Sequence, residues 1–498
     1  MRPPALLSFA TAALFTILFH GTGFGINVPL FELVLVGVAI HLKRPHWTTE
    51  LRIALGGTLL SALFVALHGS ALALWVNGLS LLLAVGSLLA PELRALHQAM
   101  RLSMQHVLPA QLAFLRGAGG GSLDAFVPKL GRSSVLPLVS VLGTVFIFAI
   151  IYRSANAHFE NLLSTVADRI DRWLVWMEAS QVLTFCVGLL VTNTLLQNTH
   201  HPVLLKRMGL ASDALLRRRT LWRPSSILGL RYELRTGVLL LALLNVLLLV
   251  VNVLDIRHVW FSFSFNGQYL KQFVHEGTWL LIVSIALGAS IVLWYFRANQ
   301  NFHQSNGLLK RLAYVWLAQN AVLAVSVAIR NFWYIHHYAL AYKRIGVVFF
   351  LIAVIAGLVL IGLKVRHTRS VHFLLRWNTF SAYVILLLMA CVDWDVVIAR
   401  YNFSKQEQAF VHLDFMATLA DKALPWLDHE QHALERIHRF NLDLLDSGSL
   451  SRSVYMEPET YGDLMAARKG LFLDTYPQRS WREWNLADAR AYTLLSTR

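Results

Sequence analysis

"IGVVFFLIAVIAGLVLIGL", residues 345–363, is an apolar run without a charged or amide side chain. As an α-helix it is about 28 Å long at 1.5 Å per residue, which is close to the thickness of the hydrocarbon core of a bilayer. Basic residues flank the run, with Lys343 and Arg344 before it and Lys364 after it. The stretch therefore predicts a transmembrane helix.

The rest of the chain repeats this pattern. Of its 498 residues 56% are hydrophobic and 14% are charged, whereas a soluble globular domain has roughly 25% charged residues. Cys186 and Cys391 both lie inside apolar runs, so a disulfide framework of the secreted type is not available. We expect an all-α fold, a polytopic membrane helix bundle of about eleven spans, near residues 5–20, 27–42, 53–69, 71–90, 135–152, 179–198, 236–254, 278–296, 312–329, 345–363 and 377–399.

Basic residues are unevenly distributed over the connections between these spans. With the N-terminus inside, the inner connections hold 24 Lys and Arg residues and the outer connections hold 8, while the tail after Ile398 holds 12. Cytoplasmic loops are enriched in Lys and Arg, and a long translocated tail is exempt from this bias. The count predicts an inside N-terminus and an outside C-terminus. The alternative for residues 1–20, a cleaved signal peptide, lacks an A-x-A site after the apolar stretch.

The inner connection 199–235 is the most basic and contains "RRRTLWR", residues 217–223. In a chain embedded in the lipid bilayer, anionic lipid headgroups are the expected neighbours of such a segment. The net charge of +16 then reflects the sidedness of the loops, and we expect no nucleic-acid partner.

The composition changes near residue 400. The chain beyond it alternates acidic and basic residues, and residues 1–399 are predicted to form the transmembrane bundle and 400–498 a small helical extracytoplasmic domain. Within the bundle, 91–108 and 156–177 carry apolar residues every three to four positions and predict interfacial helices, which lie in the headgroup layer or brace the bundle. Capping-box spacing marks three helix starts in the tail, at Ser404 with Glu407, Asp428 with Gln431, and Ser480 with Glu483.

Acidic residues inside the spans are candidate functional residues, because a charged side chain in a membrane is costly unless it faces protein or water. Glu32 lies near the outer end of the second span, and Asp393 and Asp395 lie in the last turns of the eleventh. The two aspartates are about 200° apart on a helix, so we expect only Asp393 to face a cavity.

The connection "RNFWYIHHYALAYKRIG", residues 330–346, reaches the same outer side. If it continues as a helix, Arg330, Tyr334, Tyr338 and Tyr342 form one stripe at steps of four. We expect Arg330 to pair with Asp393 and Glu32 to line the same cavity; the alternative is an aromatic belt at the membrane surface. The complete candidate binding cluster is Glu32, His275, Glu276, Arg330, Tyr334, Tyr338, Tyr342, Lys343, Arg344, Asp393 and Asp395.

Motifs for metal, cofactor or covalent chemistry are not found. "GAGGGS", residues 117–122, lacks the Gly-Lys-Ser/Thr of a P-loop, and His429 and His432 are three residues apart rather than the four of a zincin motif. We expect no metal and no cofactor, and the catalytic residues, if any, are unknown.

Five stretches resemble a known family. The runs begin at Phe24, Val274, Ala313, Val392 and Leu413 and read "FGINVPLFE", "VHEGTWLLIVSIALG", "AYVWLAQNAVLAVSVAIRNFWYIHHYALAYKRIGVVFFL", "VDWDVVIARYNF" and "LDFMATLADKALPWL". They resemble the bacterial polytopic membrane family catalogued as domain of unknown function 4173. The resemblance covers nearly the whole chain and implies a multi-pass protein of the bacterial cytoplasmic (inner) membrane without an assigned activity.

Three classes of function remain open. The first is transport or binding of a small solute through a polar pocket open to the outside. The second is a scaffold or assembly partner in a cell-envelope complex, with an envelope protein bound through the tail. The third is a membrane enzyme acting on a lipid or a lipid-linked substrate.

Overall fold

The structure is a computed structural model that describes residues 3–118, 178–199, 202–209, 211–217, 225–261, 278–446 and 456–497. Within these ranges every regular element is a helix, and the β pairing is an isolated bridge between Ala214 and Arg369. The predicted all-α fold is therefore confirmed.

The chain forms two compact units, each described by itself. The first comprises Met1–Gly209 and Arg479–Asn485, and the second Leu210–Gln478 and Leu486–Arg498. The predicted division into a transmembrane bundle, 1–399, and an extracytoplasmic domain, 400–498, stays a prediction. The helices of the first unit are α1 (Pro3–Phe19), α2 (Asn27–Lys43), α3 (Thr49–His68), α4 (Ala71–Leu89), α5 (Leu96–Ala118), α8 (Ala179–Leu196), α9 (Pro202–Gly209) and the short η8 (Trp481–Glu483).

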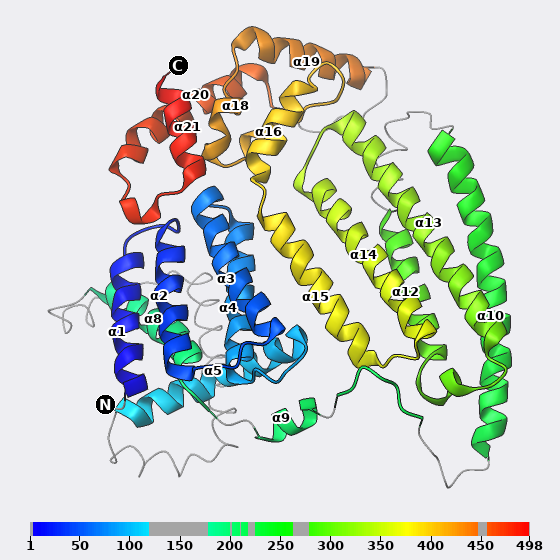
Figure 1. Cartoon of the computed structure of the whole chain (residues 1–498). Coiled ribbons are helices and arrows are strands. Elements are labelled where there is room, and N and C mark those ends of the chain that lie inside the picture. The colour runs from blue at the N-terminus through cyan, green and yellow to red at the C-terminus, as the bar shows by residue number, and fades with distance from the viewer. Residues whose placement is uncertain are drawn as a thin grey trace, which may run out of the picture. The chain divides into compact units, whose positions relative to one another are not determined.

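The second unit holds a row of long helices and the helices of the tail (Figure 1). Its long helices are α10 (Ser225–Asp255), continued by the π-helix η3 (Ile256–Phe261), then α12 (Thr278–Tyr295), η5 (Ala298–Phe302), α13 (Gly307–Tyr338), α14 (Tyr342–Arg366) and α15 (Val371–Ala390). The tail comprises α16 (Trp394–Ser404), α17 (Leu413–Ala417), η6 (Asp421–Ala423), α18 (Leu424–Leu427), α19 (Gln431–Asp446), α20 (Pro458–Thr475), η7 (Tyr476–Gln478) and α21 (Leu486–Ser496).

Seven helices of the described chain are long and apolar enough to cross a membrane, and two shorter apolar helices accompany them. The chain is thus a multi-pass membrane protein, while the number of eleven spans stays a prediction. The expected span at 135–152 and the expected interfacial helix at 156–177 lie outside the described residues. The long apolar helices are Thr49–His68, Ala71–Leu89, Ala179–Leu196, Gly229–Phe261, Gly307–Tyr338, Tyr342–Arg366 and Val371–Ala390, and the shorter ones are Pro4–Phe19 and Leu280–Tyr295.

The predicted span at 377–399 is not one helix. The chain leaves the α-helical path after Ala390, and three residues separate the end of α15 from the start of α16 at Trp394. Asp393 occupies the N-cap position of α16 with an extended backbone, φ −80° and ψ 93°. This break changes which way the two aspartates point.

Helix α5 is the predicted amphipathic helix of 91–108, displaced toward the C-terminus. Its apolar residues Leu96, Leu102 and Phe114 are buried, and α5 packs on α4 and α8. Of the predicted stripe, Leu93 and Leu96 are buried whereas Met104 is 55% exposed, so the choice between the headgroup layer and bracing of the bundle stays a prediction.

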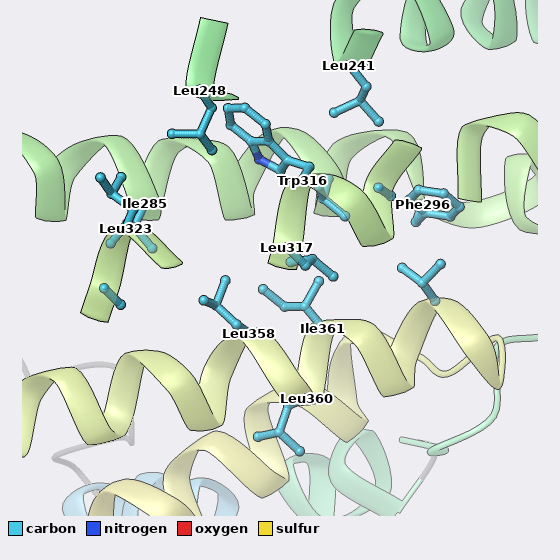
Figure 2. Packing of buried hydrophobic residues seen from close by; sticks show 14 of the residues in the cluster. Leu241, Leu248, Ile285, Phe296, Trp316, Leu317, Leu323, Leu358, Leu360 and Ile361 are labelled. Carbon is cyan, nitrogen blue, oxygen red and sulfur yellow. The ribbon is translucent and has the colours of Figure 1, made fainter. Parts of the chain in front are cut away.

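The core of the long helices in the second unit centres on α13. Trp316, Leu317 and Leu323 pack between leucines of α10 and of α14 (Figure 2). Close packing is what holds such helices together in lipid, where the hydrophobic effect between helices is weak, and small residues permit it. Gly288 illustrates this, because a Cβ at this position would lie 2.7 Å from Nε1 of Trp316.

The tail has a hydrophobic core of its own. Tyr461, Met465 and Phe472 of α20 are buried with residues of α16 to α21, and the cluster also includes Ile345 of α14 and Ile398 of α16. The tail is therefore a folded helical body whose core continues into the end of a membrane helix.

One of the three predicted capping boxes is formed. Ser480 and Glu483 bond reciprocally at the start of η8. Ser404 is instead the last residue of α16, and Asp428 follows α18 as its C-cap.

Candidate functional site

The tyrosine stripe is split between two helices. Helix α13 ends at Tyr338, and Ala339 adopts φ +59°, a left-handed value, before α14 begins at Tyr342. Tyr334 and Tyr338 therefore share a face of α13, with ring centroids 4.8 Å apart. The expected continuous helix from Arg330 to Tyr342 is wrong, because the turn reverses the chain.

Arg344 closes this turn. Its Nη1 donates to the carbonyl oxygen of Tyr338 at 2.6 Å and to that of Ala339. The guanidinium also lies over the Tyr334 ring, 4.2 Å from the centroid. A cation at the last carbonyls of a helix is favourable because those carbonyls lack helical partners and carry the negative end of the helix dipole.

Asn402 of α16 binds the same turn. Its Oδ1 accepts from the Leu340 N–H at 2.7 Å, and its Nδ2 donates to the Leu340 carbonyl at 3.0 Å. The segment after α16 also contacts the end of α13, because the Phe410 N–H donates to the His337 carbonyl at 2.8 Å. The connection between α13 and α14 is therefore held by the tail.

Lys422 of η6 lies between the two aspartates. Its Nζ is 3.0 Å from Oδ1 of Asp393 and 3.0 Å from Oδ2 of Asp395. The exposed fraction is 4% for the side chain of Lys422, 13% for Asp393 and 15% for Asp395. We expected the aspartates to point in different directions, which is wrong because Asp393 precedes the first helical residue and does not follow helix geometry.

Tyr342 extends this ion cluster. Its hydroxyl donates to Oδ1 of Asp395, which also accepts the Ala420 N–H at 3.4 Å. Burial opposes the ionisation of Asp395, but the Lys422 ammonium and these hydrogen bonds outweigh burial, so the pKa of Asp395 lies below its ordinary value. We name Lys422, Asp393, Asp395 and Tyr342 the tail lock.

Arg330 forms a different ion pair from the one predicted. Its Nη2 donates to Oδ1 of Asp255 at the end of α10, and both side chains are buried, with 6% and 10% exposed. The partners that the structure gives to Arg330 and Asp393 are thus Asp255 and Lys422, and the predicted pairing of Arg330 with Asp393 is corrected accordingly. Sequence reasoning missed Asp255, although it directly follows the predicted span 236–254.

The π-helix after Asp255 is fixed on the same helix, α13. Trp260 Nε1 donates to Oγ of Ser326 at 3.0 Å, and Trp333 Nε1 donates to the Val259 carbonyl at 3.3 Å. These bonds hold the end of α10 against the second half of α13. The Arg330 pair therefore braces two long helices.

Glu32 belongs to the first unit, and its polar contact is on α4. The side chain is buried, with 3% exposed, and Oε2 accepts from Nδ2 of Asn77 at 3.0 Å. Sequence reasoning did not select Asn77. Of the remaining predicted residues, Lys343 is exposed, and His275 and Glu276 lie outside the described residues.

Sequence reasoning also missed Lys422 and Asn402. Lys422 is the single charged residue between Asp421 and Asp428 in "DKALPWLD", and a lone cation in an apolar stretch is a sign of a buried ion. Among the described residues no group of three or more His, Cys, Asp or Glu side chains could hold a metal ion.

The fold and these contacts define a multi-pass helical membrane protein whose folded tail is fixed to the ends of its long helices. The chain belongs to the family described as "Domain of unknown function (DUF4153)", whose model matches residues 30–430. The number 4173 expected from the sequence is therefore corrected, while the assignment to a family of unknown function holds. No curated protein and no solved structure matches the chain.

Proposed function

We propose that the protein is an assembly partner in a bacterial cell-envelope complex, located in the cytoplasmic membrane, with the tail as its extracytoplasmic binding element. The observation that carries this proposal is the tail lock. The polar groups that could have lined a solute pocket bind each other, because Lys422 is held by Asp393 and Asp395 and Arg344 is held by backbone carbonyls.

A tail attached in this way presents its surface in a fixed orientation. Backbone bonds through Asn402, the tail lock and the shared core around Ile345 and Ile398 all connect it to the long helices. Fixed orientation is useful for binding a partner, because less freedom is lost on association.

Helix α20 offers an apolar surface for such a partner. Leu464 and Leu471 are 38% and 65% exposed, and with the exposed Ala467 they follow helical three-four spacing. The adjacent face of the same helix carries Tyr461, Met465 and Phe472, which fill the tail core. Contiguous exposed apolar surface of this kind marks protein contacts when it is larger, and Leu464 and Leu471 supply its centre on α20.

Site-specific photocrosslinking in intact cells tests this function. A photoreactive residue at Leu464 or at Leu471 is expected to give an adduct of one defined mass. The matched control is Ala466, which is also exposed but lies roughly 140–200° away around the helix. Adducts from all three positions, or from none of them, would rule out a specific partner on this face.

Transport or binding of a small solute is favoured by a different observation, the buried carboxyl of Glu32. An ionisable residue among apolar helices is a functional candidate because its burial is costly. Flux measurements on reconstituted Glu32→Gln protein test this second candidate, and a flux equal to that of the unsubstituted protein would exclude a role for the carboxyl.

A further inference from the structure

Three oxygen atoms converge on the amide of Asn77 in the first unit. Nδ2 of Asn77 lies 3.0 Å from Oε2 of Glu32, 3.3 Å from the carbonyl oxygen of Thr58 and 3.3 Å from Oγ of Ser61. The contacts come from three helices, α2, α3 and α4. An NH2 group has two hydrogens, so one nitrogen faces more acceptors than it can fully satisfy.

The Ser61 hydroxyl acts here as an acceptor. Its proton is directed to its own helix, because Oγ lies 2.7 Å from the Gly57 carbonyl. The Thr58 atom that faces Asn77 is the backbone carbonyl oxygen, which accepts and cannot donate. The oxygens that face Asn77 are therefore lone-pair donors, as in a site for a hard cation.

All members of this group are buried. Exposed fractions are 3% for Glu32, 0% for Thr58, 0% for Ser61 and 5% for Asn77. Among the described residues no Lys, Arg or His forms an ion pair with Glu32. A buried carboxylate without a counter-ion is expensive, so a bound cation would remove that cost.

We propose that Glu32, Thr58, Ser61 and Asn77 form a binding site for a sodium ion. Turning over the Asn77 amide replaces Nδ2 by Oδ1, which supplies a fourth oxygen at the point where the other three converge; the two ends of an amide have nearly the same shape. One carboxylate balances one positive charge, so a monovalent ion leaves the buried site neutral and a divalent ion does not.

This site deepens the second candidate function, because it names the ion that the Glu32 carboxyl takes. Sodium sites of membrane transporters use carbonyl oxygens of unwound helix segments, whereas here the carbonyl oxygen comes from Thr58 within the continuous helix α3. Ion binding is separable from transport: sodium binding without flux supports the site and rejects the transport function, whereas absence of sodium binding rejects the site itself.

The test is the thermal unfolding of the purified full chain in detergent. NaCl is increased while KCl keeps the ionic strength constant, so that unspecific salt effects cancel. The unfolding temperature is expected to rise with sodium and to saturate, because an ion that binds the folded state alone stabilises it by mass action. Identical unfolding temperatures in sodium and in potassium, at neutral and at alkaline pH, would overturn the proposal. Glu32 would then be protonated and would bind no cation.

Variants locate the effect. Glu32→Gln keeps an acceptor for Asn77 but lacks the charge, and its unfolding temperature is expected not to respond to sodium. Ser61→Ala removes one oxygen and should raise the half-saturating sodium concentration by roughly tenfold.

The matched control is Asn193→Ala in α8. Asn193 is buried and bonded to Gln111 at 2.8 Å in the same unit, so this variant loses stability but keeps its response to sodium. Binding of radioactive sodium to the unsubstituted protein, at one ion per chain, covers the case in which Glu32→Gln does not fold. A sodium response that survives in Glu32→Gln, or that is lost in Asn193→Ala, contradicts the assignment.

Discussion

Substitution of Lys422 by Met is the most direct test of the tail lock. Two carboxylates depend on this ammonium, each at 3.0 Å, and the side chain is 4% exposed. At an effective dielectric constant of 20 each pair corresponds to roughly 5 kcal/mol of attraction, which the desolvation of the three ions largely offsets. Removing one partner of a buried pair costs about 3–5 kcal/mol, and this is the loss we expect for Lys422→Met.

The measurement is the free energy of unfolding of the full chain in detergent, followed by tryptophan fluorescence. Lys469→Met is the matched control, because Lys469 also binds an aspartate of the tail, Asp428 at 2.7 Å, but with 30% of its side chain exposed. An exposed pair contributes about 0–1 kcal/mol. Equal losses in the two variants would refute the reasoning that burial makes the lock strong.

The pH dependence of the same measurement is a second readout. The folded-state pKa of Asp395 lies below its ordinary value, so the carboxylate contributes stability above the ordinary pKa of about 4 and loses it as the pH falls through the folded-state pKa. The unsubstituted protein should therefore lose stability in that acidic range, whereas Lys422→Met should lose less. A steeper loss in the variant would contradict this assignment.

Three further predictions concern other parts of the chain. Arg330→Met or Asp255→Asn alone should destabilise the folded protein by about 3–5 kcal/mol in thermal unfolding, because each leaves a buried charge without its partner. The double variant should recover part of this loss. Strictly additive losses would exclude the pair. Gly288→Ala should cost about 1–3 kcal/mol of stability, because the new methyl group meets Trp316. The control in the same assay is Gly37→Ala, where nothing lies within 4 Å of the new methyl group, and its stability should stay close to that of the unsubstituted protein. Alkaline phosphatase fused after Leu445 should be active and fused within 208–216 inactive, because of the charge distribution over the loops, and the reverse activities would overturn the predicted sidedness.

The long helices were predictable because their length and apolar content are imposed by the membrane. The run at 345–363 lies within α14, and the predicted spans at 179–198 and 278–296 agree with α8 and α12 to within a few residues. The breaks were less predictable, because Ala339 is an ordinary helix former and Asp393, although Asp is a favoured N-cap residue, lies inside a mostly apolar run.

The pairing of charges was the part that sequence could not provide. Arg330 was expected to need a buried acid, which is correct, but the choice between Asp255 and Asp393 depends on which helices pack together. Lys422 gives no sign in the sequence of the two carboxylates that it faces, because Asp393 and Asp395 lie 27 to 29 residues before it. Asn77 was hidden for a similar reason, since an amide inside an apolar helix gives no sign of which carboxyl it faces.

The Gly-rich turn between α1 and α2 is completed by a segment from the far end of the chain. Gly23 N–H donates to Oε2 of Glu483 at 2.8 Å, and Ile26 N–H donates to the Trp484 carbonyl at 2.9 Å. A Cβ at Gly25 would lie 2.4 Å from the backbone of Glu483, so the glycine makes room for this approach.

This arrangement has a consequence for biosynthesis. The α1–α2 hairpin leaves the ribosome some 460 residues before its bonding partner Glu483, so its turn keeps open N–H groups throughout translation. Helix insertion can begin early, but the first hairpin reaches its final structure last. A chain that stalls before residue 479 would leave the Gly23 and Ile26 N–H groups without these two acceptors.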